Sequence, residues 1–216
     1  PVPPAVSYIS SYEFTVHIKA SGDTRMGIIT DIKDELRTIN GIRLLYTLDE
    51  MVTPDHPYAE TEIDPYYKVE TYKESRNNII VIKTNAADRY LIGDRPDYLD
   101  GNALEKVKSY ILNKENNPDL PDKTDKEFTL PDGRIITYPV SQAMILMQND
   151  RGTSFEGYQA VNAFVQKAYR ELRNDLATEL FGRALAELSD AETAIIRQAI
   201  PMNVYEAEPK DAPARR

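Results

Sequence analysis

The chain has 216 residues, of which 41% are hydrophobic and 28% charged, and this proportion is enough to bury at least one ordinary core. Its net charge of -9 and pI near 4.9 argue against a surface for nucleic acid or anionic membranes, because such surfaces cluster Lys and Arg. The lack of cysteine excludes disulfides, thiolate metal sites and cysteine nucleophiles.

Residues 1–50 predict a strand, a helix and a second strand. Residues 13–19 alternate apolar and polar side chains, which is the period of a half-buried strand. A helix that covers a sheet is expected next, with these apolar positions at helical spacing: Ile28, Ile29, Ile32, Leu36 and Ile39. Asn40-Gly41 is a typical helix stop, and residues 42–48 alternate again. This order favours a parallel strand pair joined by a right-handed crossover.

The middle of the chain begins with a segment, residues 51–77, that is rich in Pro, Tyr and acidic residues and typical of a linker. Residues 79–84 and 89–92 then predict a β-hairpin around a four-residue loop. A helix is expected over residues 101–114, and a small extra hairpin within residues 128–138.

Residues 143–148 are nearly continuously apolar and predict a central strand. The pattern Thr153-x-x-Glu156 predicts a capping box at the start of a long helix that ends before Gly182. One apolar stripe is expected along that helix: Tyr158, Val161, Val165, Ala168, Leu172 and Leu176. The two strand-turn-helix pieces, at residues 16–37 and 144–172, share their order of pattern, which suggests a structural repeat.

A second capping box, Ser189-x-x-Glu192, predicts a shorter helix, and residues 203–206 predict a last edge strand. Together these elements indicate an α+β fold in which a two-layer mixed β-sheet carries helices on one face. We expect function to reside in an exposed strand edge or a dimer face.

Catalytic and metal-binding patterns are missing from the sequence. His17 and His56 have no zinc-ligand spacing, and there is no G-x-S-x-G motif. The turns at residues 23–25 and 150–152 precede helices, where free amides can hold an anion, but no phosphate-loop motif accompanies them. Turn and cap chemistry is therefore favoured, and we predict no catalytic residue, no cofactor and no metal.

Membrane insertion is not predicted for these residues. The longest apolar run, at residues 143–147, is far below the roughly 18 to 20 residues that a membrane helix requires. The chain begins with Pro1 and shows no signal-peptide pattern, so we expect a processed or excised fragment.

Several strings resemble the periplasmic domain of the ExbD/TolR family, in a Gram-negative branch with an extended tail. These are NIIVIKTNAADRYLIGDRP, NNPDLPDK, MQNDRGTSFEGYQAV, AYRELRNDLA and AIPMNVYEAEPK, which together cover about residues 75–210. The string DTRMGIITDIKDELRTINGIRLLYTL is similar to the C-terminal strand-helix-strand of a second ExbD/TolR-type paralogue. The resemblance implies four parts: a half-domain at 1–50, a linker at 51–77, an ExbD-like domain at 78–210 and a tail at 211–216.

The resemblance also implies a function. Family members help transmit proton-motive force for outer-membrane transport, as dimerising, non-enzymatic periplasmic components that work with an ExbB-like membrane subunit and a TonB-like transducer. They are anchored in the inner membrane by an N-terminal helix with an essential aspartate, and nothing in this sequence matches that helix. The expected partners include a homo- or heterodimer with an ExbD paralogue. The partner-contact candidates are Gln148, Asn149, Asp150 and Arg151.

Two other classes of function remain open on the sequence. A ferredoxin-like or ACT-like regulatory module would bind a small metabolite at a strand-helix turn, and the Gly22 turn before the first helix is its basis. A phage or envelope structural protein is the third reading, supported by acidity and the lack of cysteine.

Overall fold

The computed structural model describes residues 14–36, 42–48, 76–93 and 95–207. Its main feature is a mixed five-stranded sheet in the order β5-β4-β3-β8-β9, within an α+β fold of the predicted class. The strands of this sheet are β3 (Ile79–Thr84), β4 (Tyr90–Ile92), β5 (Arg95–Asp97), β8 (Met144–Asn149) and β9 (Val204–Glu206). The predicted hairpin, central strand and final edge strand are thereby confirmed.

The centre of the sheet is the parallel pair β3 and β8, in which Ile82 lies beside Met147. Both side chains are fully buried, as is Ile145 on the same face. Residues two apart in a strand share a face, so these apolar positions form a continuous core row. This row supports the helices that lie over it.

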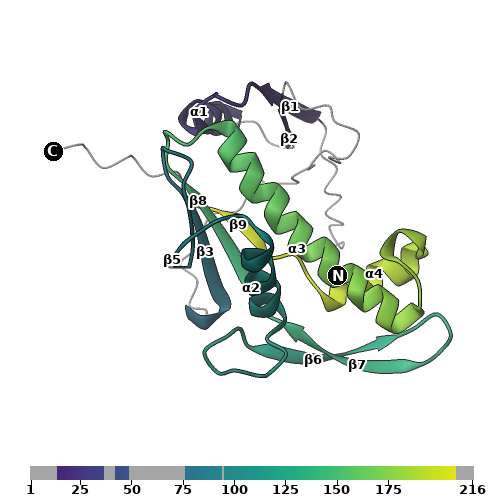
Figure 1. The fold of residues 1–216 in the computed structure, drawn as a ribbon. Helices are drawn as coiled ribbons and strands as arrows, with labels where there is room; N and C mark the ends of the chain where they lie inside the picture. Colours follow the sequence, from purple (N-terminus) through teal and green to yellow (C-terminus); the bar gives the residue numbers. More distant parts are fainter. Residues whose placement is uncertain (1–13, 37–41, 49–75, 94, 208–216) are drawn as a thin grey trace, which may run out of the picture.

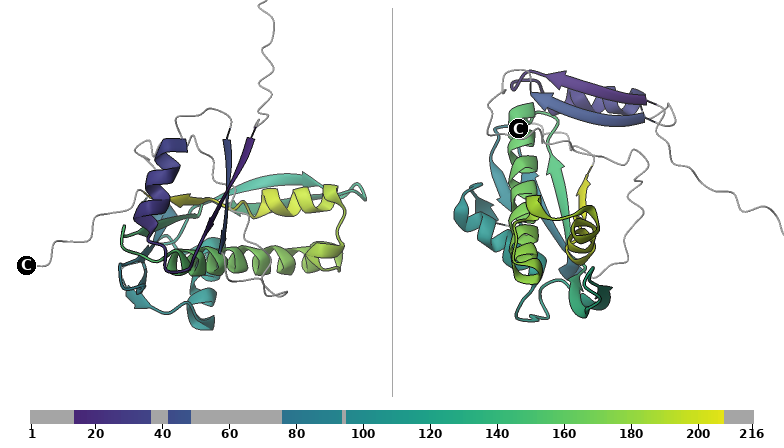
Figure 2. Two further views of the ribbon diagram at one scale, coloured as in Figure 1. Left: turned by 90° about the horizontal axis from the view of Figure 1, so that it is seen from above. Right: turned by 90° about the vertical axis from the view of Figure 1, so that its right-hand side faces the viewer.

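The helices α2 (Gly101–Leu112) and α3 (Phe155–Phe181) lie over this face of the sheet, with α3 running along its length (Figures 1 and 2). The predicted stripe of α3 is buried throughout. Gly182 ends the helix in the left-handed conformation, at φ 67°, which glycine adopts without a steric penalty. Residues 76–207 also contain two short 3₁₀ helices, η1 (Arg76–Asn78) and η2 (Leu185–Glu187), and the helix α4 (Asp190–Ala199).

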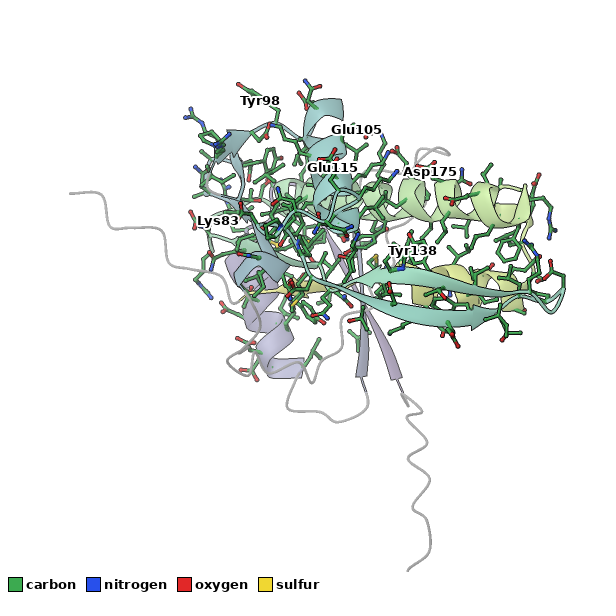
Figure 3. The ribbon with its side chains drawn as sticks, turned by 90° about the horizontal axis from the view of Figure 1, so that it is seen from below. Lys83, Tyr98, Glu105, Glu115, Tyr138 and Asp175 are labelled. Carbon is green, nitrogen blue, oxygen red and sulfur yellow. The ribbon has the colours of Figure 1, made fainter. Side chains whose placement is uncertain are left out.

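The predicted extra hairpin is longer than expected. It consists of β6 (Lys123–Thr129) and β7 (Ile135–Ser141), paired over seven register positions. The middle of the hairpin is mostly exposed and polar, so the apolar periodicity predicted only part of its length. Phe128 and Val140 are buried in the core. Tyr138 projects from this hairpin toward the helices (Figure 3).

A separate group of three elements lies across the start of α3 (Figure 1). It is the N-terminal unit, made of β1 (Phe14–Ala20), α1 (Met26–Leu36) and β2 (Ile42–Leu48). β1 and β2 pair in parallel, as predicted, and among the described strands they form a sheet of their own. Its buried residues Ile18, Met26 and Ile29 nevertheless belong to the same core cluster as those of the main sheet.

The prediction for the buried face of α1 was wrong in part. Ile28 is 56% exposed and Ile32 is 42% exposed, whereas Met26, Ile29 and the charged Lys33 are buried. The helix packs against the rest of the chain as well as its own strands. On that side Lys33 forms a salt bridge with the carboxylate of Glu206. A buried partner for the lysine was not visible in a periodicity of apolar residues. The predicted Ile39 and the stop at Asn40-Gly41 lie outside the described residues.

The start of α4 is stabilised by the carboxylate of Glu192, which makes this region sensitive to pH. Glu192 accepts hydrogen bonds from the Ser189 amide and hydroxyl, both at 2.8 Å, in the predicted capping box, and it pairs with Arg183. The Ser189 amide first, and then the hydroxyl and the guanidinium, lower the pKa of Glu192 below its ordinary value of 4.5. A lowered folded pKa stabilises the folded state above the unfolded value, and this contribution is lost as pH falls from about 4.5 through the folded pKa.

We therefore expect α4 to loosen on acidification below pH 4.5. Glu192→Gln should flatten that part of the stability-versus-pH curve, measured by urea unfolding between pH 6 and pH 3 at intervals of about half a unit. The carboxyl pKa is read directly by NMR titration. A Glu192 carboxyl that titrates at its ordinary value would contradict the assignment.

Candidate docking site

The turn between β8 and α3 is held rigidly by the β3-β4 hairpin. This α3 turn comprises residues 150–156. The Thr153 hydroxyl, fully buried, donates to the Thr84 carbonyl at 3.0 Å. The Asp150 carboxylate accepts from the Ala86 amide at 3.1 Å, and the Asp88 carboxylate accepts from the Ser154 amide at 2.9 Å. Three side chains thus fix the backbone of the turn before any partner is considered.

These bonds explain why the predicted cap at Thr153 was wrong. The helix begins at Phe155, and Ser154 is its N-cap, with the Ser154 hydroxyl accepting from the Gly157 amide at 2.9 Å. Thr153 has the same capping chemistry, but its hydroxyl accepts from the Asp150 amide, and the Glu156 amide that it would cap donates to the Gly22 carbonyl instead. The predicted cap and the true cap are adjacent hydroxyl residues that local sequence alone does not separate.

Two glycines allow the hairpin to approach the turn this closely. A Cβ on Gly152 would lie 2.7 Å from the Ala86 Cβ, and one on Gly157 would lie 2.6 Å from an oxygen of Asp88. Both distances are shorter than normal contacts, so larger residues would push the hairpin away. The carboxylates gathered here have an electrostatic effect: burial and then the charges of Asp88 and Glu156 raise the pKa of Tyr90.

The α3 turn meets a second turn that precedes α1. This α1 turn comprises residues 21–27. Its Met26 amide donates to the Thr153 carbonyl and its Gly27 amide to the Arg151 carbonyl, both at 2.8 Å. The bonds also run in the opposite direction: Phe155 N to Thr24 O at 2.7 Å, and Glu156 N to Gly22 O at 2.9 Å. Each helix start therefore satisfies its free amides with carbonyls of the other turn.

This arrangement decides between two predictions for the helix-start turns. Free amides at a helix N-terminus attract anions. Here the amides of Met26, Gly27, Phe155 and Glu156 are bound to carbonyls. The turns are thus joined to each other, and the backbone groups that an anion would need are occupied.

Side chains add contacts around the two turns. Arg25 donates from Nη1 to the Gly152 carbonyl at 2.8 Å. Arg151 donates to both carboxylate oxygens of Asp31, at 2.8 and 2.9 Å. Asp31 is 63% exposed, and exposed pairs of this kind contribute only about 0–1 kcal/mol. The charged pair orients the helices more than it stabilises them.

A more buried charge pair lies deeper in the interface. Lys33 of α1 binds Glu206 of the edge strand β9, and Tyr158 of α3 donates its hydroxyl to the same carboxylate. The side chains of Lys33 and Glu206 are only 7% and 16% exposed. Removing one member of such a pair leaves the other as an uncompensated buried charge. The pair therefore fixes the position of α1 relative to β9.

The four predicted contact residues have different positions. Arg151 reaches the N-terminal unit. Asp150 holds the hairpin, Asn149 is buried at the end of β8, and Gln148 is half-buried opposite Lys83. The structure contains no partner, so contacts of these residues with another protein remain a prediction.

The sequence suggested a metabolite at the Gly22 turn, as an alternative, and a cap at Thr153, and it did not point to Gly27 or to the contact between the two turns. The available signal was the repeated order of a polar turn, a threonine and a helix start, at Thr24 and Thr153. A glycine at position 27, inside a helix, was a second signal, because glycine costs about 1 kcal/mol there relative to alanine. A glycine at such a position indicates that another segment approaches the helix too closely for a side chain.

A cleft of about 370 Å³ lies beside the middle of α3, between α3 and α4. It is lined by three arginines, of which Arg173 donates to the Ile200 carbonyl at 2.9 and 3.0 Å. Burial, and then the nearby Arg197, lower the pKa of Arg173. These bonds cap the C-terminus of α4, which is a structural role.

The described residues contain neither a metal-binding cluster nor a membrane-spanning helix. No group of three or more His, Asp or Glu side chains there is arranged to hold a metal ion. Among the helices in that part of the chain, none combines the length and apolar character needed to cross a membrane. Comparison of the chain with protein-family models, with curated proteins and with solved structures gives no match. The two joined turns are therefore the best-defined candidate site.

Two buried threonines give a matched prediction about the α3 turn. Thr153→Val should lower the free energy of unfolding by about 0.5–1.5 kcal/mol, because the Thr84 carbonyl loses the Thr153 hydroxyl and keeps only the Asp150 amide as a donor. Thr84→Val is the control, because the buried Thr84 hydroxyl has no hydrogen-bond partner among the described residues. Its replacement should be neutral or slightly stabilising. Urea unfolding measures both, and equal losses would contradict the bracing role of Thr153.

Proposed function

We propose that this chain is a non-enzymatic docking component of a proton-motive-force-driven complex in the bacterial envelope, of the ExbD/TolR type. It works in the periplasm, held at the inner membrane by the N-terminal helix that this family carries. There it dimerises and contacts an ExbB-like membrane subunit and a TonB-like transducer. The resemblance of residues 75–210 and 12–50 to two paralogues of that family supplies the identity of the complex.

The observation that carries the docking role is the reciprocal main-chain bonding between the α1 turn and the α3 turn. Main-chain bonding of this kind recognises backbone shape and needs no catalytic group. The α3 turn is braced by the β3-β4 hairpin, so little conformational entropy is lost when a partner turn binds. These properties suit a component that joins strand-helix units.

The alternative reading, a ferredoxin-like or ACT-like module, would place a metabolite at the Gly22 turn. In the structure a Cβ on Gly22 would lie 3.3 Å from the Glu156 Cβ, so this turn is in contact with α3. A thermal-shift screen with amino acids and nucleotides tests the alternative directly. A ligand at 100 times its dissociation constant stabilises the protein by about 2.7 kcal/mol.

Photo-crosslinking in intact cells of the native host tests the proposed function. A photoreactive residue at Gln148, in the predicted contact string, should form adducts with integral inner-membrane proteins, and a protonophore should change their yield. The same group at Tyr98, which is 79% exposed in the segment between β5 and α2, is the control. Adducts at Gln148 no more abundant than at Tyr98, or insensitive to the protonophore, would contradict the proposal.

A further inference from the structure

The two turns are related by an approximate two-fold axis. Each bond from the α1 turn has a counterpart from the α3 turn: Met26 N to Thr153 O corresponds to Phe155 N to Thr24 O, and Gly27 N to Arg151 O corresponds to Glu156 N to Gly22 O. The counterparts are separated by one constant offset along the chain, which also relates Arg25 to Ser154. Those two residues form an antiparallel bridge on the axis. Exchanging the turns leaves the backbone pattern unchanged.

Backbone bonding alone would therefore let an α3 turn accept a second copy of itself. An isologous pair uses the same surface on both partners, and this pattern of donors and acceptors is self-complementary. Selection between like and unlike turns must come from side chains.

The side chains at the closest contacts are unlike. Gly27 faces Arg151, and a Cβ on Gly27 would lie 3.2 Å from the Arg151 carbonyl oxygen and 3.3 Å from its Cβ. Gly22 faces Glu156 in the same way, at 3.3 Å between Cβ positions. Each contact thus has one glycine and one larger residue. Two α3 turns would place Arg151 against Glu156 at both contacts, with no glycine at either.

The polar contacts are also specific to an unlike pair. Arg151 crosses Gly27 to reach Asp31, and the residue at the same offset from Asp31 is Ala160. Arg25 reaches the Gly152 carbonyl, whereas its counterpart Ser154 is too short to do so. A second α3 turn would offer neither bond.

We propose that the α3 turn selects an unlike strand-turn-helix unit and rejects a copy of itself. The partner turn has glycine at the positions of Gly22 and Gly27 and a carboxylate one helical turn further on, at the position of Asp31. The N-terminal unit of this chain is such a partner. In an assembly of several copies, each α3 turn pairs with the α1 turn of its own chain and does not pair with a second α3 turn. The proposal rests on the docking role and specifies its partner.

Gly27→Leu tests this selection on the purified full chain. The added side chain should separate the turns, so the Phe155 and Glu156 amides should exchange with solvent at least about tenfold faster. Gly101→Leu is the matched control, because Gly101 also lies in the first turn of a helix and a Cβ there meets nothing within 4 Å. Its exchange at Phe155 and Glu156 should equal that of the unmodified chain.

Sedimentation velocity over a range of protein concentrations provides the second readout. Gly27→Leu should not self-associate more strongly than the unmodified chain, because the freed α3 turn does not fit a copy of itself. Two results would overturn the proposal: unchanged protection of Phe155 and Glu156 in Gly27→Leu, or new dimers in which those two amides regain protection.

Asp31→Arg guards against a folding failure of Gly27→Leu, because Asp31 is 63% exposed. The introduced positive charge repels Arg151, so amide exchange at Phe155 and Glu156 should rise by about two- to fivefold. Added salt should reduce this increase. Unchanged exchange would remove the carboxylate from the proposed partner pattern. Because these measurements use the purified chain, their failure is distinguishable from a failure to capture membrane partners in the envelope.

Discussion

The main-chain pairing of two helix-start turns is the constraint on which the rest of this structure depends. A helix N-terminus leaves its first amides without partners, and burying them unpaired costs about 1–3 kcal/mol each. In this chain the amides of Met26 and Gly27, and those of Phe155 and Glu156, are satisfied by the opposite turn. Burial of the interface and satisfaction of the amides therefore require each other, and this fixes the register of α1 against α3.

The pairing works because one turn is prepared by its own surroundings. Thr153, Asp150 and Asp88 hold the α3 turn against the β3-β4 hairpin. The close approach of that hairpin depends on Gly152 and Gly157. The α1 turn contributes a flat face with Gly22 and Gly27, and the Lys33 and Glu206 pair adds a buried contact at its far end. The rigid α3 turn and the glycine-containing α1 turn together form a specific interface.

Most of the fold was predictable because its elements have strong local signals. The hairpin pattern of residues 79–92 and the continuous apolar run of β8 identified the sheet, and the stripe of α3 with Gly182 identified its main helix. The exposed Ile28 and Ile32 were mispredicted because the orientation of α1 is set by tertiary contacts through Lys33. The cap at Ser154 was missed for a similar reason, since the Glu156 amide that Thr153 would cap donates to the distant Gly22 carbonyl.

The site itself was only partly predictable. The repeated strand-turn-helix order indicated two similar pieces, but no sequence pattern specified that their turns meet. The decisive residues are small or use backbone atoms, and such contacts leave little trace in charge or periodicity. Gly27 inside a helix was a signal for a close contact, but only the structure identifies Arg151 as the residue beside it.

The most direct test of the pairing is an NMR measurement of scalar couplings across hydrogen bonds in the isotope-labelled chain. The account predicts couplings from the Met26 amide nitrogen to the Thr153 carbonyl carbon, and from the Phe155 amide nitrogen to the Thr24 carbonyl carbon. Couplings within β3 and β8 that are present while both of these are absent would contradict it.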